Sequence, residues 1–334
     1  MPWLEFFLCC LVIAVAGTQL SRFGDAIADK TGLGRTWVGV IMLAMVTSLP
    51  ELVTGISSVT VADVPDIAVG DVLGSCVFNL MIIFLLDFMY RRQSLYLVAS
   101  QGHILGAAFS IMLIGFAGFH ILLSTSQSMP SFGHISSATP IIFLMYAVAM
   151  HTVFRYERRE VAEYAEARED AYPDITLRQA VTRYVIAALF VVAAGAWLPF
   201  VAGELAKQMG WTESFVGTLF VAFVTSLPEV VVTIAALRLG ALDMAIGNLF
   251  GSNLFNSLVL AIDDVFFMKG PLFEYVSPAH AVSALSAVMM TGVAIVGLFY
   301  RPGTRLFRTV GWTSVVLFTI YLLNGYVIYL VASD

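Results

Sequence analysis

The stretch Val46-Thr47-Ser48-Leu49-Pro50-Glu51 recurs without change as residues 224–229, 178 residues further along this 334-residue chain. The match extends upstream, where Val38-Gly39 corresponds to Val216-Gly217. A repeat of this kind predicts that the chain consists of two related halves, each carrying the same polar motif.

A second block follows the first in both halves. Residues 66–79 (DIAVGDVLGSCVFN) correspond to residues 243–256 (DMAIGNLFGSNLFN), and Asp87 corresponds to Asp264. Two blocks that recur in the same order leave little room for a chance match.

The composition indicates a membrane protein. Hydrophobic residues make up 59% of the chain and charged residues 12%, whereas an ordinary soluble domain carries about 25% charged residues. Many apolar runs reach roughly 18 to 25 residues, about the length that an α-helix needs to cross a ~30 Å hydrocarbon layer. We therefore predict an all-α membrane protein with ten transmembrane helices. They are residues 3–21, 36–61, 66–90, 100–123, 138–154, 180–205, 213–238, 241–267, 279–300 and 307–331.

Residues 155–179, rich in Arg and Glu, form the only long hydrophilic stretch. We expect a first five-helix repeat in residues 1–154, a linker at 155–179 and a second repeat in residues 180–334. Because five is odd, the second repeat must enter the membrane from the opposite side, so the repeats are inverted. Inverted repeats with matching polar interruptions are typical of secondary transporters that bind their substrate near the midplane.

The basic residues predict the orientation, because Lys and Arg collect in short cytoplasmic loops. With both termini outside, only Lys207 and Lys269 of the 17 basic residues fall on the outer side. We therefore expect a multi-pass protein of the cell (inner) membrane, with both termini outside and the linker in the cytoplasm. A cleaved signal peptide is not expected, because the first 20 residues lack a positive start and contain Glu5.

The first motif places oxygen atoms on one helix face. At about 100° per residue, Thr47 and Glu51 lie one turn apart, and Ser48 lies close to the same face. Pro50 has no N–H for the carbonyl of Val46, so the helix is expected to kink there. A carbonyl freed inside a membrane is costly unless it lines a cavity or binds a ligand. The same reasoning applies to Thr225, Ser226, Pro228 and Glu229.

The second block adds a matching surface. Ser75 and Asn79 are four residues apart, as are Ser252 and Asn256, so each pair shares a helix face. Gly70 with Gly74, and Gly247 with Gly251, give the spacing that allows close helix approach. We expect four polar helix segments to line one pocket.

The predicted ligands are all oxygen atoms, which suit the hard cations Ca²⁺ and Na⁺. No His or Cys joins the motifs, which argues against zinc, copper and iron. The predicted ion site comprises Glu51, Glu229, Thr47, Ser48, Thr225, Ser226, Ser75, Asn79, Ser252 and Asn256, with Asp71, Ala44 and Ala222 as additional candidates.

The remaining polar residues are assigned structural roles. Asp66 and Asp243 stand at helix starts and fit N-terminal capping, whereas Asp87 and Asp264 fall near helix ends and suit interfacial or capping roles. The five histidines are far apart in sequence and are interpreted as structural. No cofactor, nucleic-acid partner or obligatory protein partner is indicated, and the partners we expect are the lipid bilayer and the transported ions.

The doubled motifs resemble those of the calcium/cation antiporter superfamily, whose two α-repeats carry T-S-x-P-E followed by G-N-x-x-G-S-N-x-x-N. The resemblance covers nearly the whole chain. It implies a transporter rather than an enzyme, one that exchanges Ca²⁺ for Na⁺ by alternating access while the first and sixth helices slide. The two glutamates would bind Ca²⁺, and the hydroxyls and motif backbone would share the Na⁺ sites.

This chain departs from the superfamily pattern in the first repeat, where Asp71 and Cys76 each replace an Asn. Potassium-dependent relatives carry an Asp at the place of Asn256, so potassium dependence is not expected here. Proton/calcium antiport through the same glutamates is the nearest rival hypothesis, because buried carboxylates can titrate near neutral pH. A channel fits inverted repeats less well than a carrier does. An intramembrane aspartyl protease using Asp71 is a more distant hypothesis, since it would not explain the doubled glutamate motif.

Overall fold

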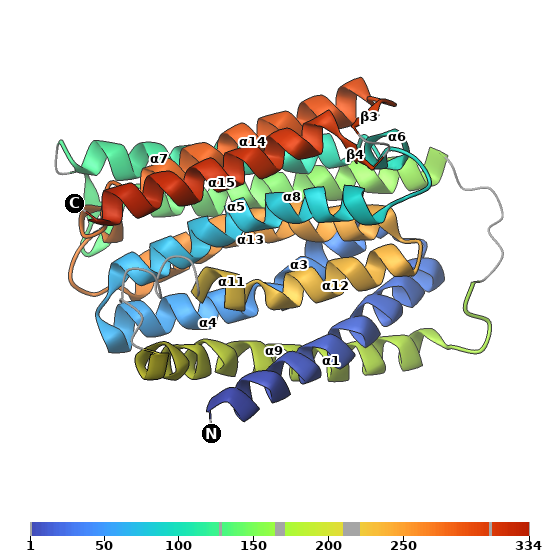
Figure 1. Ribbon diagram of the computed structural model, residues 1–334, viewed down its shortest axis with the longest axis horizontal. Coiled ribbons are helices and arrows are strands. Elements are labelled where there is room, and N and C mark those ends of the chain that lie inside the picture. The colour runs from blue at the N-terminus through green and yellow to red at the C-terminus, as the bar shows by residue number, and fades with distance from the viewer. Residues whose placement is uncertain (1, 127–128, 164–170, 210–220, 307–308, 334) are drawn as a thin grey trace.

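The computed structural model describes residues 2–126, 129–163, 171–209, 221–306 and 309–333, and these residues are mostly helical (Figure 1). The long helices are α1 (Pro2–Thr31), α5 (Pro65–Met89), α7 (His103–Ser124), α8 (Ala138–Glu163), α9 (Leu177–Met209), α13 (Leu242–Phe266), α14 (His280–Tyr300) and α15 (Trp312–Ser333). Two interrupted segments complete the bundle. The first comprises α2 (Arg35–Trp37), the π-helix η1 (Val38–Leu43), α3 (Ala44–Thr47), α4 (Leu49–Ser57) and the π-helix η2 (Ser58–Ala62). The second comprises α11 (Ala222–Thr225) and α12 (Leu227–Arg238).

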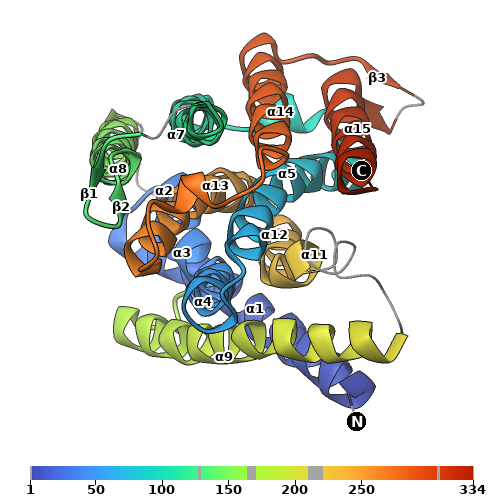
Figure 2. The same ribbon diagram turned by 90° about the vertical axis from the view of Figure 1, so that its left-hand side faces the viewer.

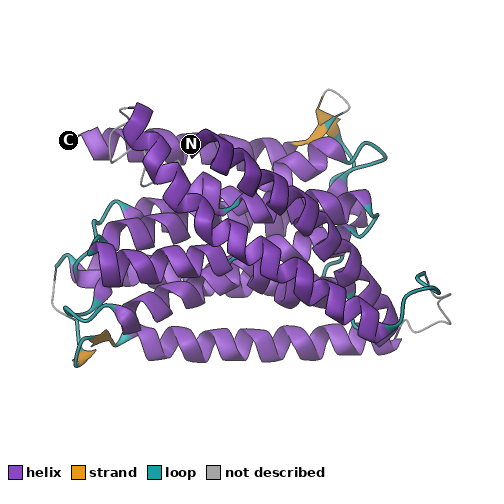
Figure 3. Ribbon diagram, turned by 90° about the horizontal axis from the view of Figure 1, so that it is seen from below, coloured by secondary structure: helices purple, strands orange, loops and turns teal. Residues whose placement is uncertain are grey.

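The connections are short. They contain the helical turns α6 (Leu95–Val98) and η4 (Leu272–Glu274) and two antiparallel hairpins. The hairpin β1 (Ser131–Phe132) with β2 (Ile135–Ser136) and the hairpin β3 (Arg305–Leu306) with β4 (Val310–Gly311) lie at opposite ends of the helices (Figure 3).

Nine helical segments among the described residues are long and apolar enough to cross a membrane. They match nine of the ten predicted segments. The remaining prediction, residues 213–238, lies partly outside the described residues, and its described part forms α11 and α12. The predicted repeat match at Val216-Gly217 also lies outside them.

Two predicted boundaries were wrong by more than a few residues. Helix α1 was expected to end at residue 21 but continues to Thr31, and α8 was expected to end at residue 154 but continues to Glu163. Both extensions carry several charged residues, so their mean hydropathy is too low to mark them as part of an apolar span. Gly32, with φ of +68°, follows α1 and adopts the left-handed conformation that commonly terminates a helix.

The helices form three layers (Figure 2). α1 and α9 pack along one side, α3, α4, α11, α12, α5 and α13 occupy the middle, and α7, α8, α14 and α15 cover the other side. Of the span of α13, 89% is buried, against 33% for α1 and 29% for α9. The central layer, which carries both repeated motifs, is therefore shielded from lipid.

Close helix approach occurs where glycines were predicted to allow it. A side chain at Gly247 would meet the carbonyl oxygen of Thr36 at 2.8 Å, and one at Gly251 would collide with the carbonyl of Val40. The π-helix η1 therefore lies directly against α13. The equivalent contact of Gly70 and Gly74 would fall on the counterpart of η1, in residues outside the described ranges.

The prediction that Asp66 and Asp243 cap their own helices was wrong. Asp66 accepts hydrogen bonds from the Ser277 backbone N–H (2.7 Å) and faces His280 Nε2 (2.8 Å), at the start of α14. Asp243 likewise binds the Ser100 N–H (2.7 Å) and faces His103 Nε2 (3.0 Å), at the start of α7. Each aspartate of a central helix thus holds the start of an outer helix from the other half.

Asp87 and Asp264 have the predicted capping role, again across the halves. Asp87 accepts from the N–H of Gly311 (2.7 Å) and the hydroxyl of Ser314 (2.8 Å), at the start of α15. Asp264 accepts from the Ser136 N–H (2.8 Å) and the Thr139 hydroxyl, at the start of α8.

Lys269, just after the end of α13, pairs with Asp63, just before the start of α5, so these two helices run in opposite directions and the equivalent contacts of Asp66 and Asp243 fall at opposite ends of the bundle. We call the end that carries Asp63, Asp66 and Lys269 the Asp66 end, and the end that carries Ser100 and Asp243 the Asp243 end. The two halves are therefore inverted relative to each other.

We expect Asp264→Asn to lower the free energy of unfolding by about 2 kcal/mol, because three donors lose a charged acceptor and the new amide presents hydrogens to them. Thermal unfolding in detergent measures the effect. The control is Asp63→Asn in the exposed ion pair with Lys269, for which about 0–1 kcal/mol is expected. Equal Tm values for the two variants would contradict this role of Asp264.

Candidate ion-binding site

Both repeated motifs interrupt their helices at the serine. Ser48 separates α3 from α4 with φ −92° and ψ 6°, and Ser226 separates α11 from α12 with φ −81° and ψ 5°. Pro50 and Pro228 then stand in the first turn of the new helix, where a missing N–H is tolerated. The kinks predicted from the prolines are confirmed, and each glutamate lies in the first turn of a helix, where the macrodipole favours negative charge.

Each glutamate accepts a hydrogen bond from the motif serine of the other repeat. The hydroxyl of Ser48 donates to Glu229 Oε1 at 3.0 Å, and the hydroxyl of Ser226 donates to Glu51 Oε1 at 3.4 Å. All four side chains are fully buried. These two reciprocal hydrogen bonds hold both motifs together in the centre of the bundle.

Residues of the second repeated block, in α5 and α13, line the other side of the site. Ser252 lies 3.5 Å from Glu229 Oε1, and Ser75 lies 2.9 Å from Ser226. Thr47 Oγ1 lies 3.4 Å from Ser252 Oγ. The four polar segments predicted to line one pocket therefore meet.

The remaining predicted ligands lie around this centre. The carbonyls of Ala44 and Ala222 accept hydrogen bonds from the threonine hydroxyls three residues later, at 3.3 Å and 3.1 Å. Asn79 donates to Asn253 Oδ1 at 3.1 Å. Asn256 is fully buried, and neither polar atom of its side chain has a hydrogen-bond partner among the described residues.

Negative charge in this region is unbalanced. Glu51 and Glu229 each keep one oxygen, Oε2, without a hydrogen-bond partner in the described part of the chain, and no described Lys or Arg pairs with either. A buried carboxylate without a partner is costly in a membrane, so this arrangement favours a bound cation. No three His, Cys, Asp or Glu side chains of the described residues form a ready-made metal cluster. Hydroxyl, amide and carbonyl oxygens would therefore supply most ligands.

The site is not fully symmetric. Thr47 faces Asn248 Oδ1 at 3.4 Å, whereas its mate Thr225 donates to Asp71 Oδ1 at 2.8 Å. Asn248, Asn253 and Asp263 were not among the residues predicted from the sequence. Asn248 is the repeat equivalent of Asp71. Asn253 could have been found as the mate of Cys76. Asp263 could have been found as a buried acid whose mate, Leu86, is apolar.

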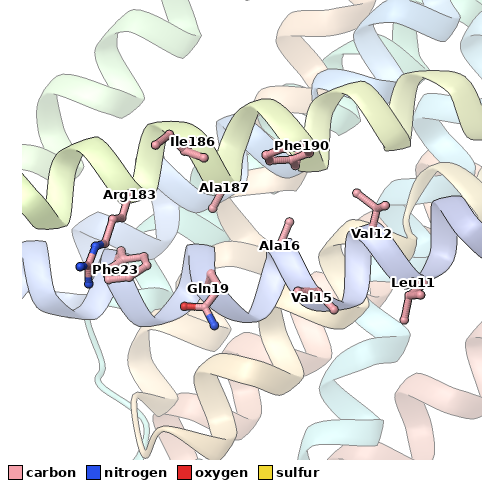
Figure 4. Close-up of a pocket in the computed structure, with 10 residues that line it drawn as sticks. All are labelled: Leu11, Val12, Val15, Ala16, Gln19, Phe23, Arg183, Ile186, Ala187 and Phe190. Carbon is pink, nitrogen blue, oxygen red and sulfur yellow. The ribbon is translucent and has the colours of Figure 1, made fainter.

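One pocket in the described part of the chain is separate from this site. It has a volume of about 500 Å³, lies between α1 and α9, and is lined by apolar side chains except for Gln19 and Arg183 (Figure 4). Arg183 lies over the ring of Phe23, 5.5 Å from its centroid. An apolar lining of this kind does not suit a bare cation.

Inverted halves, interrupted central helices and a buried all-oxygen site define the class of secondary-active membrane transporters. Comparison with known proteins then gives the family. The sodium/calcium exchanger protein family matches residues 1–155 and 180–329. The chain therefore belongs to the sodium/calcium exchanger family, whose members are cation antiporters rather than enzymes.

Individual relatives agree with this assignment. The chain is 25% identical to inner membrane protein YrbG of Escherichia coli over 75% of each chain, and 24% identical to an uncharacterized membrane protein of Methanocaldococcus jannaschii over 95% of each. It is 34% identical to the sodium/calcium exchanger MaX1 of Methanosarcina acetivorans over 35% of this chain and 31% of that one. The solved structure of the sodium-calcium exchanger NCX_Mj has the same fold, with a TM-score of 0.72 and 17% identity over 96% of both chains.

Proposed function

We propose that this protein exchanges Ca²⁺ for Na⁺ across the membrane, at a site built on Glu51 and Glu229. The observation that carries the proposal is the reciprocal pairing of Ser48 with Glu229 and of Ser226 with Glu51. It gathers two buried carboxylates with unsatisfied oxygens at the centre of the inverted halves. Two carboxylates balance one Ca²⁺ or much of the charge on several Na⁺, and the same oxygens cannot serve both ions at once.

The predicted ligands are proposed to act as one set. The two carboxylates take Ca²⁺, while the hydroxyls and the motif backbone share the Na⁺ sites. The further members of the set are Thr47, Ser48, Thr225, Ser226, Ser75, Ser252, Asn79, Asn256, Ala44 and Ala222. Hard cations prefer such oxygens, and Ca²⁺ takes about 6–8 of them in flexible geometry.

Alternating access is proposed to involve α1 and α9. These two helices form their own layer against the central helices (Figure 2). Gly195 in α9 lies against both motif prolines, since a side chain there would approach Pro50 Cγ to 2.5 Å and Pro228 Cγ to 3.5 Å. A small residue facing both prolines suits a helix that slides past them. We place both termini outside and residues 155–179 in the cytoplasm, which puts the Asp243 end inside.

Proton/calcium antiport is the second candidate. It is favoured by the complete burial of Glu51 and Glu229, because buried carboxylates can exchange protons.

Uptake of radioactive Ca²⁺ into proteoliposomes separates the two candidates. We expect an outward Na⁺ gradient to drive uptake and an imposed pH gradient without Na⁺ to drive none. An ionophore that collapses the pH gradient should leave Na⁺-driven uptake intact. Uptake driven by the pH gradient alone would refute sodium coupling and establish the second candidate.

A further inference from the structure

Asp263 is an acid that the proposed exchange site does not use. It lies in α13, is fully buried, and neither of its carboxylate oxygens has a hydrogen-bond partner among the described residues. Its neighbour Asp264 has the opposite environment, since it accepts hydrogen bonds at the start of α8 and from the backbone N–H of Leu272, the first residue of η4. Both Asp263 oxygens therefore keep their full capacity to accept a hydrogen bond or to bind a cation.

The carboxylate of Asp263 rests on Gly55 of α4. A side chain on Gly55 would collide with both oxygens of Asp263, which are its nearest neighbours. Gly55 is four residues after Glu51, so Asp263 lies one helical turn beyond Glu51. Since α4 leads through η2 to Asp63, this turn lies on the Asp66 side of the exchange site.

The symmetry of the repeats indicates that Asp71 also lies beside Gly55. In the second half, Asn248 Nδ2 donates to the hydroxyl of Thr233 at 3.0 Å. The equivalents in the first half are Asp71 and Gly55. Without a hydroxyl at residue 55, Asp71 Oδ2 has no hydrogen-bond partner in the described part of the protein. Since Gly55 takes the place of Thr233 and lies against the Asp263 carboxylate, the repeat symmetry indicates that Asp71 and Asp263 flank the same glycine.

The opposite side of the exchange site has no such pair. There, Asn248, Thr233 and Leu86 stand at the positions of Asp71, Gly55 and Asp263. The amide and the hydroxyl satisfy each other, and the leucine is fully buried. One side is therefore neutral and satisfied, while the other carries two buried carboxylates with three unsatisfied oxygens.

We propose that Asp71 and Asp263 form a second cation site beside Gly55, one helical turn from Glu51 on the Asp66 side only. Its ligand is a hard divalent cation, since two carboxylates match its charge and oxygen preference. On one side of the membrane, the second site would hold Ca²⁺ before it enters or after it leaves the exchange site. This role rests on the proposed exchange function, whereas the existence of the binding site does not.

Binding of radioactive Ca²⁺ to the purified full chain, at low Na⁺, tests the second site. In Glu51→Gln/Glu229→Gln protein, which removes both carboxylates of the exchange site, we expect saturable Ca²⁺ binding to persist. Adding Asp263→Asn or Asp71→Asn should weaken this residual binding by about tenfold or more, the order of loss seen when a supporting metal contact is removed. Adding Asp63→Asn, which removes an exposed charge at the same end, should leave it unchanged.

Gly55→Ala provides a variant that keeps both charges. The added methyl group occupies the space of the Asp263 carboxylate, so residual binding should fall although no charge is lost. Size-exclusion profiles identify any variant that fails to fold. Absence of residual binding in folded Glu51→Gln/Glu229→Gln protein, or residual binding that survives Asp263→Asn, would overturn the second site. Failure of Na⁺-driven uptake by the wild-type chain would overturn the proposed exchange alone.

Discussion

Glu51→Gln and Glu229→Gln are each expected to reduce Ca²⁺ transport by about 100-fold or more, because each removes a charged ligand from a buried site. Both carboxylates are fully buried, and each keeps an oxygen without a partner among the described residues. Initial rates of Ca²⁺ uptake into proteoliposomes measure the effect. The matched control is Glu204→Gln on the exposed face of α9, which should retain the wild-type rate.

The same two variants should gain stability when no cation is present. A neutral amide relieves the cost of burying an uncompensated carboxylate, so Tm in chelator should rise above that of the wild-type chain. Added Ca²⁺ should stabilise the wild type more than either variant. A variant that transports at the wild-type rate, or one whose Tm falls in chelator, would contradict the site assigned to that glutamate.

Gly251→Ala is expected to destabilise the protein by about 3 kcal/mol, at the upper end of the cost of overpacking. A methyl group there would meet backbone atoms of Val40, with the Cα at 2.6 Å and the carbonyl carbon at 2.7 Å. Backbone atoms cannot rotate away as a side chain can, so α13 must separate from η1. Thermal unfolding in detergent measures the loss, and transport should fall with it because this contact positions Ser252.

Gly292→Ala in α14 is the control for that substitution. Gly292 is also helical, but no atom lies within 4 Å of the position that its methyl group would take. Alanine should therefore be neutral or stabilising by about 1 kcal/mol, since it favours the helix more than glycine does. Equal stability of the two variants would show that the close contact of α13 with η1 does not contribute as described.

The central part of the fold was predictable because the same two sequence motifs occur in both halves of the chain. The recurrence of Thr47 to Glu51 as Thr225 to Glu229 predicted two inverted halves, and the one-turn spacing of Ser75 and Asn79 predicted a shared face. Helix periodicity and repeat symmetry are local properties, so they survive without knowledge of the tertiary structure. The structure brings these residues together, while their role in binding ions stays a proposal.

Other features could not be predicted because they depend on which elements become neighbours. Asp66 stands at the start of α5 and looks like its cap, yet its partners lie more than 200 residues later, at Ser277 and His280. The importance of Asp263 depends on Gly55, which is far away in sequence and carries no side chain to signal the contact. Helix ends such as Thr31 were missed because a helix can continue beyond the apolar segment that hydropathy detects.

Aspartates of each half bind the helix starts of the other half, and these contacts determine whether the chain can be divided into two fragments. Asp66 and Asp87 of α5 hold the starts of α14 and α15, while Asp243 and Asp264 of α13 hold the starts of α7 and α8. Cutting the polypeptide within residues 155–179 would separate each aspartate from the helix start that it holds, because every one of these contacts joins one half to the other. Each fragment alone would leave two aspartates and two helix starts without these contacts. The two fragments are thus interlocked, and neither is a self-sufficient folding unit.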